Sequence, residues 1–133
     1  MNFDIMNIAD PHKFYYEKHQ NTIDKINKII PIKKNDDDKS LFRFYYDDYL
    51  VHILSVDADI IYRTFVSINI DMIREGKKKG QDMIFIFKFN DDVFYWKYTD
   101  KQIVVGYNYT DSHKLPKTIH IFTKHLNSIT LYQ

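Results

Sequence analysis

Residues 82–98, which read DMIFIFKFNDDVFYWKY, decide the fold of the β-rich part of this chain. Two runs of apolar side chains flank the polar stretch Asn90-Asp91-Asp92, and this pattern predicts a β-hairpin. Because side chains in a strand alternate between faces, Met83, Phe85, Phe87 and Phe89 share one face and Ile84, Ile86 and Lys88 the other. In the second strand, Val93, Tyr95 and Lys97 oppose Phe94, Trp96 and Tyr98. Both faces are apolar, so we expect the hairpin to lie centrally and to be covered on both sides.

An amphipathic helix is predicted over residues 11–30. Asp10 is a favoured N-cap, Pro11 suits the first helical position, and Pro31 ends the pattern. The apolar stripe consists of Tyr15, His19, Ile23, Ile26 and Ile30. A polar linker, residues 31–40, follows and separates this helix from a β-rich body over residues 41–133.

Strands are predicted throughout that body. Residues 41–46 and 49–56 form two strands joined by Asp47-Asp48. From Ile60 to Met72 the even positions are mostly apolar, which favours a long strand, although a helix that ends at Gly76 remains an open alternative. Residues 83–89, 93–98 and 103–110 would form a meander, and residues 118–125 a last strand.

These elements predict one α+β domain, in which the N-terminal helix packs on a curved, mostly antiparallel sheet of about six or seven strands. One helix covers only one face of such a sheet. The sheet must therefore close on itself, pack as two layers or leave an apolar patch for a partner.

Composition limits where the protein acts. The 18 acidic and 19 basic residues nearly cancel, so no overall charge draws the chain to nucleic acid or to an anionic membrane. The chain has no cysteine, no leader-like start and no apolar run long enough for a membrane helix. We therefore expect a soluble, cytoplasmic protein without a membrane partner.

No catalytic, cofactor or metal motif is present in the sequence; the three glycines, for example, form no phosphate-binding loop. The sequence predicts a non-enzymatic binding or assembly module that contacts a protein partner or a second copy through an aromatic face of the meander. That face would comprise Tyr95, Trp96, Tyr98, Tyr107 and Tyr109.

Two alternatives stay open. In a nucleic-acid-binding protein, Lys77, Lys78, Lys79 and Lys97 would contact phosphates while the aromatic rings stack on bases. In a small enzyme, two of Asp57, Asp59, Asp82 and His120 would have to converge in a pocket.

Residues 80–99, GQDMIFIFKFNDDVFYWKYT, resemble the central hairpin of PD-(D/E)xK nucleases. Asp82 matches the family's first metal-binding aspartate and Lys97 its lysine, but Tyr95 stands in place of the second carboxylate. The resemblance implies a nuclease-like fold whose metal site lacks a ligand. This hairpin, together with residues 116–129 and the biased composition, also resembles small proteins of AT-rich large DNA viruses, which implies a viral source.

Overall fold

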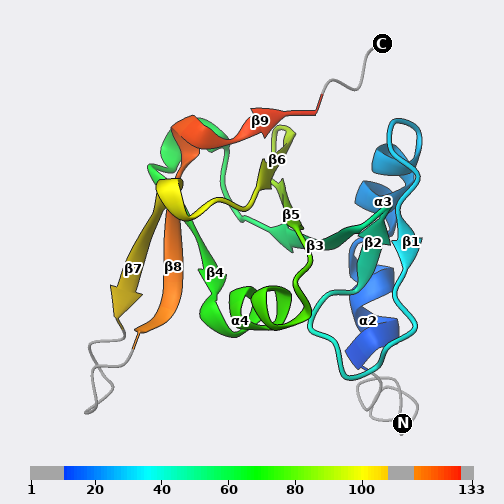
Figure 1. Ribbon diagram of the computed structural model, residues 1–133. Coiled ribbons are helices and arrows are strands. Elements are labelled where there is room, and N and C mark those ends of the chain that lie inside the picture. The colour runs from blue at the N-terminus through cyan, green and yellow to red at the C-terminus, as the bar shows by residue number, and fades with distance from the viewer. Residues whose placement is uncertain (1–10, 108–115, 130–133) are drawn as a thin grey trace, which may run out of the picture.

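A computed structural model describes residues 11–107 and 116–129 of the protein. These residues form an α+β fold, as the sequence predicts, and Figure 1 shows it as three layers. The N-terminal helices lie on one side of a mixed six-stranded sheet, ordered β1-β2-β3-β5-β6-β9, which is not closed. A three-stranded sheet, ordered β4-β8-β7, lies on the other side.

The six-stranded sheet is built from β1 (Lys33–Lys34), β2 (Phe44–Tyr46), β3 (Tyr49–Ser55), β5 (Met83–Lys88), β6 (Val93–Lys97) and β9 (Asn127–Ser128). The predicted hairpins β2–β3 and β5–β6 are both antiparallel. Strands β3 and β5 run parallel, with Leu50 opposite Met83. Parallel neighbours need a long crossover, and here it carries β4 and α4.

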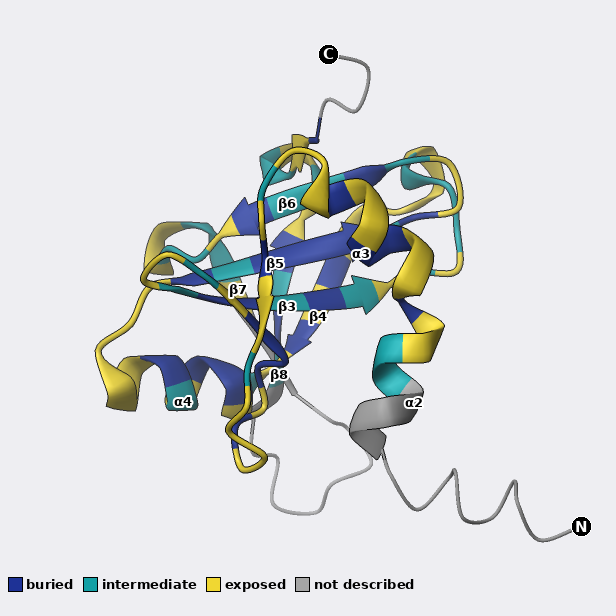
Figure 2. Ribbon diagram, turned by 90° about the vertical axis from the view of Figure 1, so that its right-hand side faces the viewer, coloured by how far each residue is buried: buried dark blue, intermediate teal, exposed yellow. Residues whose placement is uncertain are grey.

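The predicted N-terminal helix is present as α2 (Pro11–Lys18) and α3 (Gln20–Asn27), which are separated at His19. Its predicted stripe faces the sheet: Ile23 and Ile26 are buried against Phe44, Val51, Ile53 and Ile86. Figure 2 views the sheet from this side and shows long buried stretches along β3 and β5. The helices thus cover the face of the hairpin that carries Ile84, Ile86 and Tyr95.

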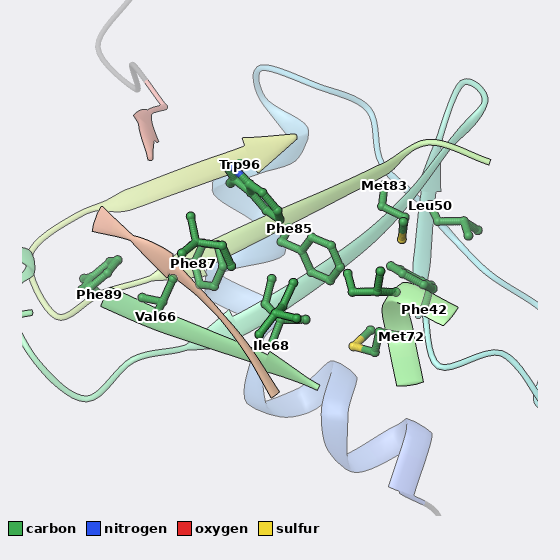
Figure 3. Packing of buried hydrophobic residues seen from close by; sticks show 13 residues of the cluster. Phe42, Leu50, Val66, Ile68, Met72, Met83, Phe85, Phe87, Phe89 and Trp96 are labelled. Carbon is green, nitrogen blue, oxygen red and sulfur yellow. The ribbon is translucent and has the colours of Figure 1, made fainter. Parts of the chain in front are cut away.

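The second face of the hairpin is covered by the chain itself. Phe85, Phe87, Phe89 and Trp96 pack against Val66 and Ile68, together with Met72, Ile119 and Ile121 (Figure 3). These partners come from β4 (Phe65–Asn69), α4 (Ile70–Lys79) and β8 (Pro116–Phe122). Of the three arrangements predicted for the strands, the chain adopts the second: two sheets packed face to face.

Two sequence-based expectations are wrong in this region. The strand predicted from Ile60 to Met72 stops at Asn69, because the Asn69 side chain accepts a hydrogen bond from the Asp71 N–H at 2.8 Å and so caps α4. Gly80, with φ of +65°, ends that helix in the left-handed conformation. The meander also breaks, because β7 (Ile103–Tyr107) pairs with β8 and not with β6.

The segment between the helices and the body is anchored at a few points. Ile32 and Ser40 are buried, and β1 pairs with β2. The buried Arg43 side chain donates hydrogen bonds to the carbonyl groups of Asp37, at 3.0 Å, and Ser40. Most of residues 31–40, predicted as a polar linker, are exposed.

Candidate protein interface

Trp96 is not on a surface. Its side chain is 1% exposed, lies in the core between the two sheets, and donates a hydrogen bond from Nε1 to the Gln102 side chain at 2.8 Å. The sequence-based placement of Trp96 in a contact face is therefore corrected. The sequence predicted only one helix to cover the hairpin, but the three-stranded sheet covers its second face and buries Trp96.

The other predicted aromatic residues are also drawn into local packing. Tyr95 is half-buried against the core beneath the N-terminal helices, and Tyr98 packs on the core between the sheets, with its hydroxyl bonded to Asp100. Tyr107 ends β7, and its side chain is outside the described part, as is all of Tyr109. The predicted aromatic face is therefore not one continuous surface in the described residues.

Three of the four lysines predicted to contact phosphate have partners among the described residues, and Lys78 has none there. Lys77 forms an ion pair with Asp100 at 3.2 Å, and its hydrogen bonds with Tyr98 and Asp100 raise its pKa. Lys79 pairs with Glu75 at 2.9 Å and with Asp37 at 3.7 Å. Lys97 donates to the Tyr49 hydroxyl at 3.0 Å. No groove joins these lysines to Trp96, because Trp96 is buried.

The nuclease-like pair forms no ion pair in the part of the chain that the structure describes. Asp82 precedes β5 and Lys97 ends β6. The hydrogen bond that Lys97 donates to the Tyr49 hydroxyl is the main cause of the raised pKa of Lys97, and the charge of Asp82 adds a smaller effect. Tyr95 contributes no carboxylate there. Within residues 11–107 and 116–129, no three His, Asp or Glu side chains are grouped to hold a metal ion.

The acids and histidine of the enzyme alternative do not converge. Asp57 lies in a groove beside β4, whereas Asp82 lies at the start of β5. His120 lies on β8, where its Nδ1 is 2.8 Å from the Ser67 hydroxyl. The described residues thus give this alternative no assembled site.

An exposed apolar surface is instead found on the outer face of the three-stranded sheet. Phe65 of β4 and Phe122 of β8 are directly opposite each other, and they are 43% and 41% exposed. The His120 ring packs edge-on against Phe65 at 4.7 Å, and exposed Val104 of β7 lies opposite His120. The inner face of the same strands carries the buried core residues Val66, Ile68, Ile119 and Ile121.

A short helix, η1 (Ile60–Tyr62), precedes β4 in the chain. Ile61 and Tyr62 are 81% and 80% exposed, the highest values among the large apolar side chains that the structure describes. We call Ile61, Tyr62, Phe65, Val104, His120 and Phe122 the outer face. Large apolar side chains gathered on one exposed surface mark contact sites more often than scattered ones do.

Cations border the outer face. Arg63 is exposed between Tyr62 and Phe65, and the Lys124 ammonium lies 5.9 Å from the centre of the Phe122 ring. Neither forms an ion pair with any described residue. The surface is therefore suited to apolar groups accompanied by negative charge.

One feature of the sequence indicates this exposed surface. In the alternating segment, Phe65 stands on the odd positions among polar Arg63, Ser67 and Asn69. A large aromatic residue on the polar side of a strand indicates contact beyond the strand's own core. The same holds for Phe122, which follows His120 on the outward positions of β8.

A second cavity, of about 390 Å³, lies between α2 and β3 and is lined by Tyr15, His19 and His52, among others. Burial, followed by the nearby charges of His19 and Arg43, lowers the pKa of His52 to about 4. His52 Nδ1 is buried without a hydrogen-bond partner among the described residues. A metal ion bound to Nε2 of His52 would leave the proton on Nδ1, where it has no acceptor among the described residues. His19 and His52 are therefore poorly arranged to bind a metal together.

No described helix is both long and apolar enough to cross a membrane. Comparisons with protein-family models, with curated proteins and with solved structures found no match to this chain.

Proposed function

We propose that this protein is a non-enzymatic binding module whose outer face docks a partner protein. The observation that carries the proposal is the pairing of exposed Phe65 and Phe122 on the outside of the three-stranded sheet, preceded in the chain by the highly exposed Ile61 and Tyr62. Such residues are well suited to anchor a contact, since aromatic and large apolar side chains supply most of the binding energy at interfaces.

The partner's chemistry follows from the border of the outer face. Arg63 and Lys124 lack acidic partners among the described residues, so burying the apolar side chains beside them favours a segment that brings carboxylates. We therefore expect an apolar segment with acidic residues. A self-complementary contact is less favoured, because two copies would bring these cations together. We place the interaction in the cytoplasm, in keeping with the absence of cysteine.

The test uses short random peptides displayed on phage, selected on the immobilised protein and then synthesised with a fluorescent label. We expect enrichment of apolar, acidic sequences, and at least about tenfold weaker binding to Tyr62→Ser than to the wild type, because truncated anchors cost more than ~1.4 kcal/mol. Leu41→Ser is the matched control, since Leu41 is also exposed but lies before β2. Selected peptides that bind both variants like the wild type would refute the proposal.

Nucleic-acid binding is the second proposal, because residues 80–99 resemble the nuclease hairpin and the charge of Asp82 acts on Lys97. It has less support, since Lys77 and Lys79 are paired with acids. Filter binding of single-stranded and duplex oligonucleotides distinguishes it: phosphate contacts give an affinity that falls steeply with added salt. We expect no such salt-dependent affinity.

A further inference from the structure

Strand β4 is an edge strand, and its hydrogen-bonding pattern shows which of its backbone groups are available. The Thr123 N–H donates to the Thr64 carbonyl at 2.9 Å, so Thr64 and Thr123 are a hydrogen-bonded pair. Antiparallel strands alternate hydrogen-bonded and non-hydrogen-bonded pairs. Phe65 and Ser67, opposite Phe122 and His120, therefore direct their N–H and C=O groups away from β8.

These backbone groups have no hydrogen-bond partner within the described residues. They face a groove of about 260 Å³ that runs between β4 and residues 54–57 at the end of β3. The groove is lined by Phe65, Val66 and Ser67 and reaches the buried Phe87. Figure 3 shows Val66 and Phe87 together in the core that this groove borders.

The groove also holds two opposite charges, which set where a carboxylate of the occupant can lie. Arg63 and Asp57 both line it, and no described residue forms an ion pair with either side chain. A strand added beside β4 would place alternate side chains next to Val66, on the apolar inner side, and next to Phe65, on the outer face. A carboxylate near Arg63 would complete the match.

We propose that the partner docks as an extended acidic and apolar peptide, which adds a strand to the free edge of β4 and pairs with Phe65 and Ser67. This inference rests on the proposed function and specifies how the partner binds. Main-chain hydrogen bonds then give affinity, and side chains beside Val66 and Arg63 give specificity, as in other cases of strand addition.

The test compares Ser67→Pro with Ser67→Ala, using the labelled peptides selected above. Both substitutions remove the Ser67 hydroxyl and its 2.8 Å contact with His120, but only proline removes the N–H that faces the groove. The ladder to β8 does not use that N–H, and edge strands tolerate proline. We expect at least about tenfold weaker binding to Ser67→Pro and a change within about twofold for Ser67→Ala.

A second measurement does not depend on the proline variant folding. In the wild type, amide hydrogen exchange at Phe65 and Ser67 should slow on saturation with peptide, while Val66, already bonded to β8, should change little. Unchanged exchange at Phe65 and Ser67, or equal binding to the proline and alanine variants, would overturn strand addition.

The two proposals fail separately. If Tyr62→Ser weakens peptide binding and Ser67→Pro does not, the outer face binds a partner but β4 does not receive a strand. If neither variant weakens binding, both proposals fail. If light scattering shows a wild-type dimer that Ser67→Pro converts to monomer, the occupant is a second copy, and the proposal of a foreign peptide is overturned.

Discussion

At the scale of single residues, burial determines what each polar side chain can do. His52 is held between the Tyr15 ring, stacked at 5.3 Å, and the edge of Phe42, and its Nδ1 has no partner among the described residues. A buried imidazole strongly favours the neutral form. His19, also buried, contacts the same tyrosine at 4.5 Å, and burial lowers its pKa too.

These histidines predict acid sensitivity. The pKa of His52 is about 4 in the folded protein against 6.5 for an ordinary histidine, so the unfolded chain binds its proton first. Stability is therefore full above pH 6.5 and falls as the pH drops to about 4, a loss of about 3 kcal/mol from this residue. Urea unfolding at several pH values measures it.

His52→Phe keeps a ring of similar size and should remove that part of the loss. His19→Phe removes the nearby charge but not the burial of His52, so it should leave most of this part in place. The same pH dependence in His52→Phe as in the wild type would contradict the assignment.

At the scale of elements, the helices do more than cover the sheet. Strand β3 pairs with β2 only from Tyr49 to Val51, which leaves its edge open at Ile53. The Tyr15 hydroxyl closes this edge: it donates to the Ile53 carbonyl at 2.8 Å and accepts from the Ile53 N–H at 2.9 Å. A side chain from α2 thus replaces one residue of a neighbouring strand, which protects the edge from pairing elsewhere.

Tyr15→Phe should therefore destabilise the fold by about 1–3 kcal/mol, because both backbone groups of Ile53 lose their partner while the ring remains. Tyr16→Phe is the matched control. Among the described residues, the Tyr16 hydroxyl bonds the Arg43 carbonyl, at 3.2 Å, and the Arg43 side chain. We expect a smaller loss, because the Arg43 carbonyl also accepts from the Asn35 N–H at 2.9 Å. Equal free energies of unfolding for the two variants, measured with urea, would show that the Tyr15 hydroxyl does not close the edge.

At the scale of the whole molecule, the β5–β6 hairpin belongs to two cores. One face packs with Ile23 and Ile26 of α3, and the other with Ile68 and Ile121 of the three-stranded sheet. Loss of either cover would expose one face of the hairpin. The layers should therefore unfold together, in one cooperative transition.

Ile26→Ala and Ile121→Ala test whether the layers unfold together. Both isoleucines are fully buried, Ile26 in the core under the helices and Ile121 in the core between the sheets. Each should cost about 2–5 kcal/mol. Trp96 fluorescence reports the core between the sheets, and far-UV circular dichroism reports all layers. In both variants the two signals should shift together. A circular-dichroism transition that precedes the fluorescence change in Ile26→Ala would mean that the helices detach alone.

Local sequence determined much of this protein: the faces of the hairpin, the apolar stripe that includes Ile23 and Ile26, and the turn at Asp47-Asp48. Each of these depends on the spacing of neighbouring residues. Only the tertiary structure decided which strands pair across long separations and what covers each face. Strand β7 joins β8 and not the preceding strand β6, and in the resulting two-sheet structure Trp96 is buried while Phe65 and Phe122 are exposed. Alternation marks Phe65 as an aromatic residue on the polar side of its strand, but its exposure also depends on which surfaces of the folded chain cover that side.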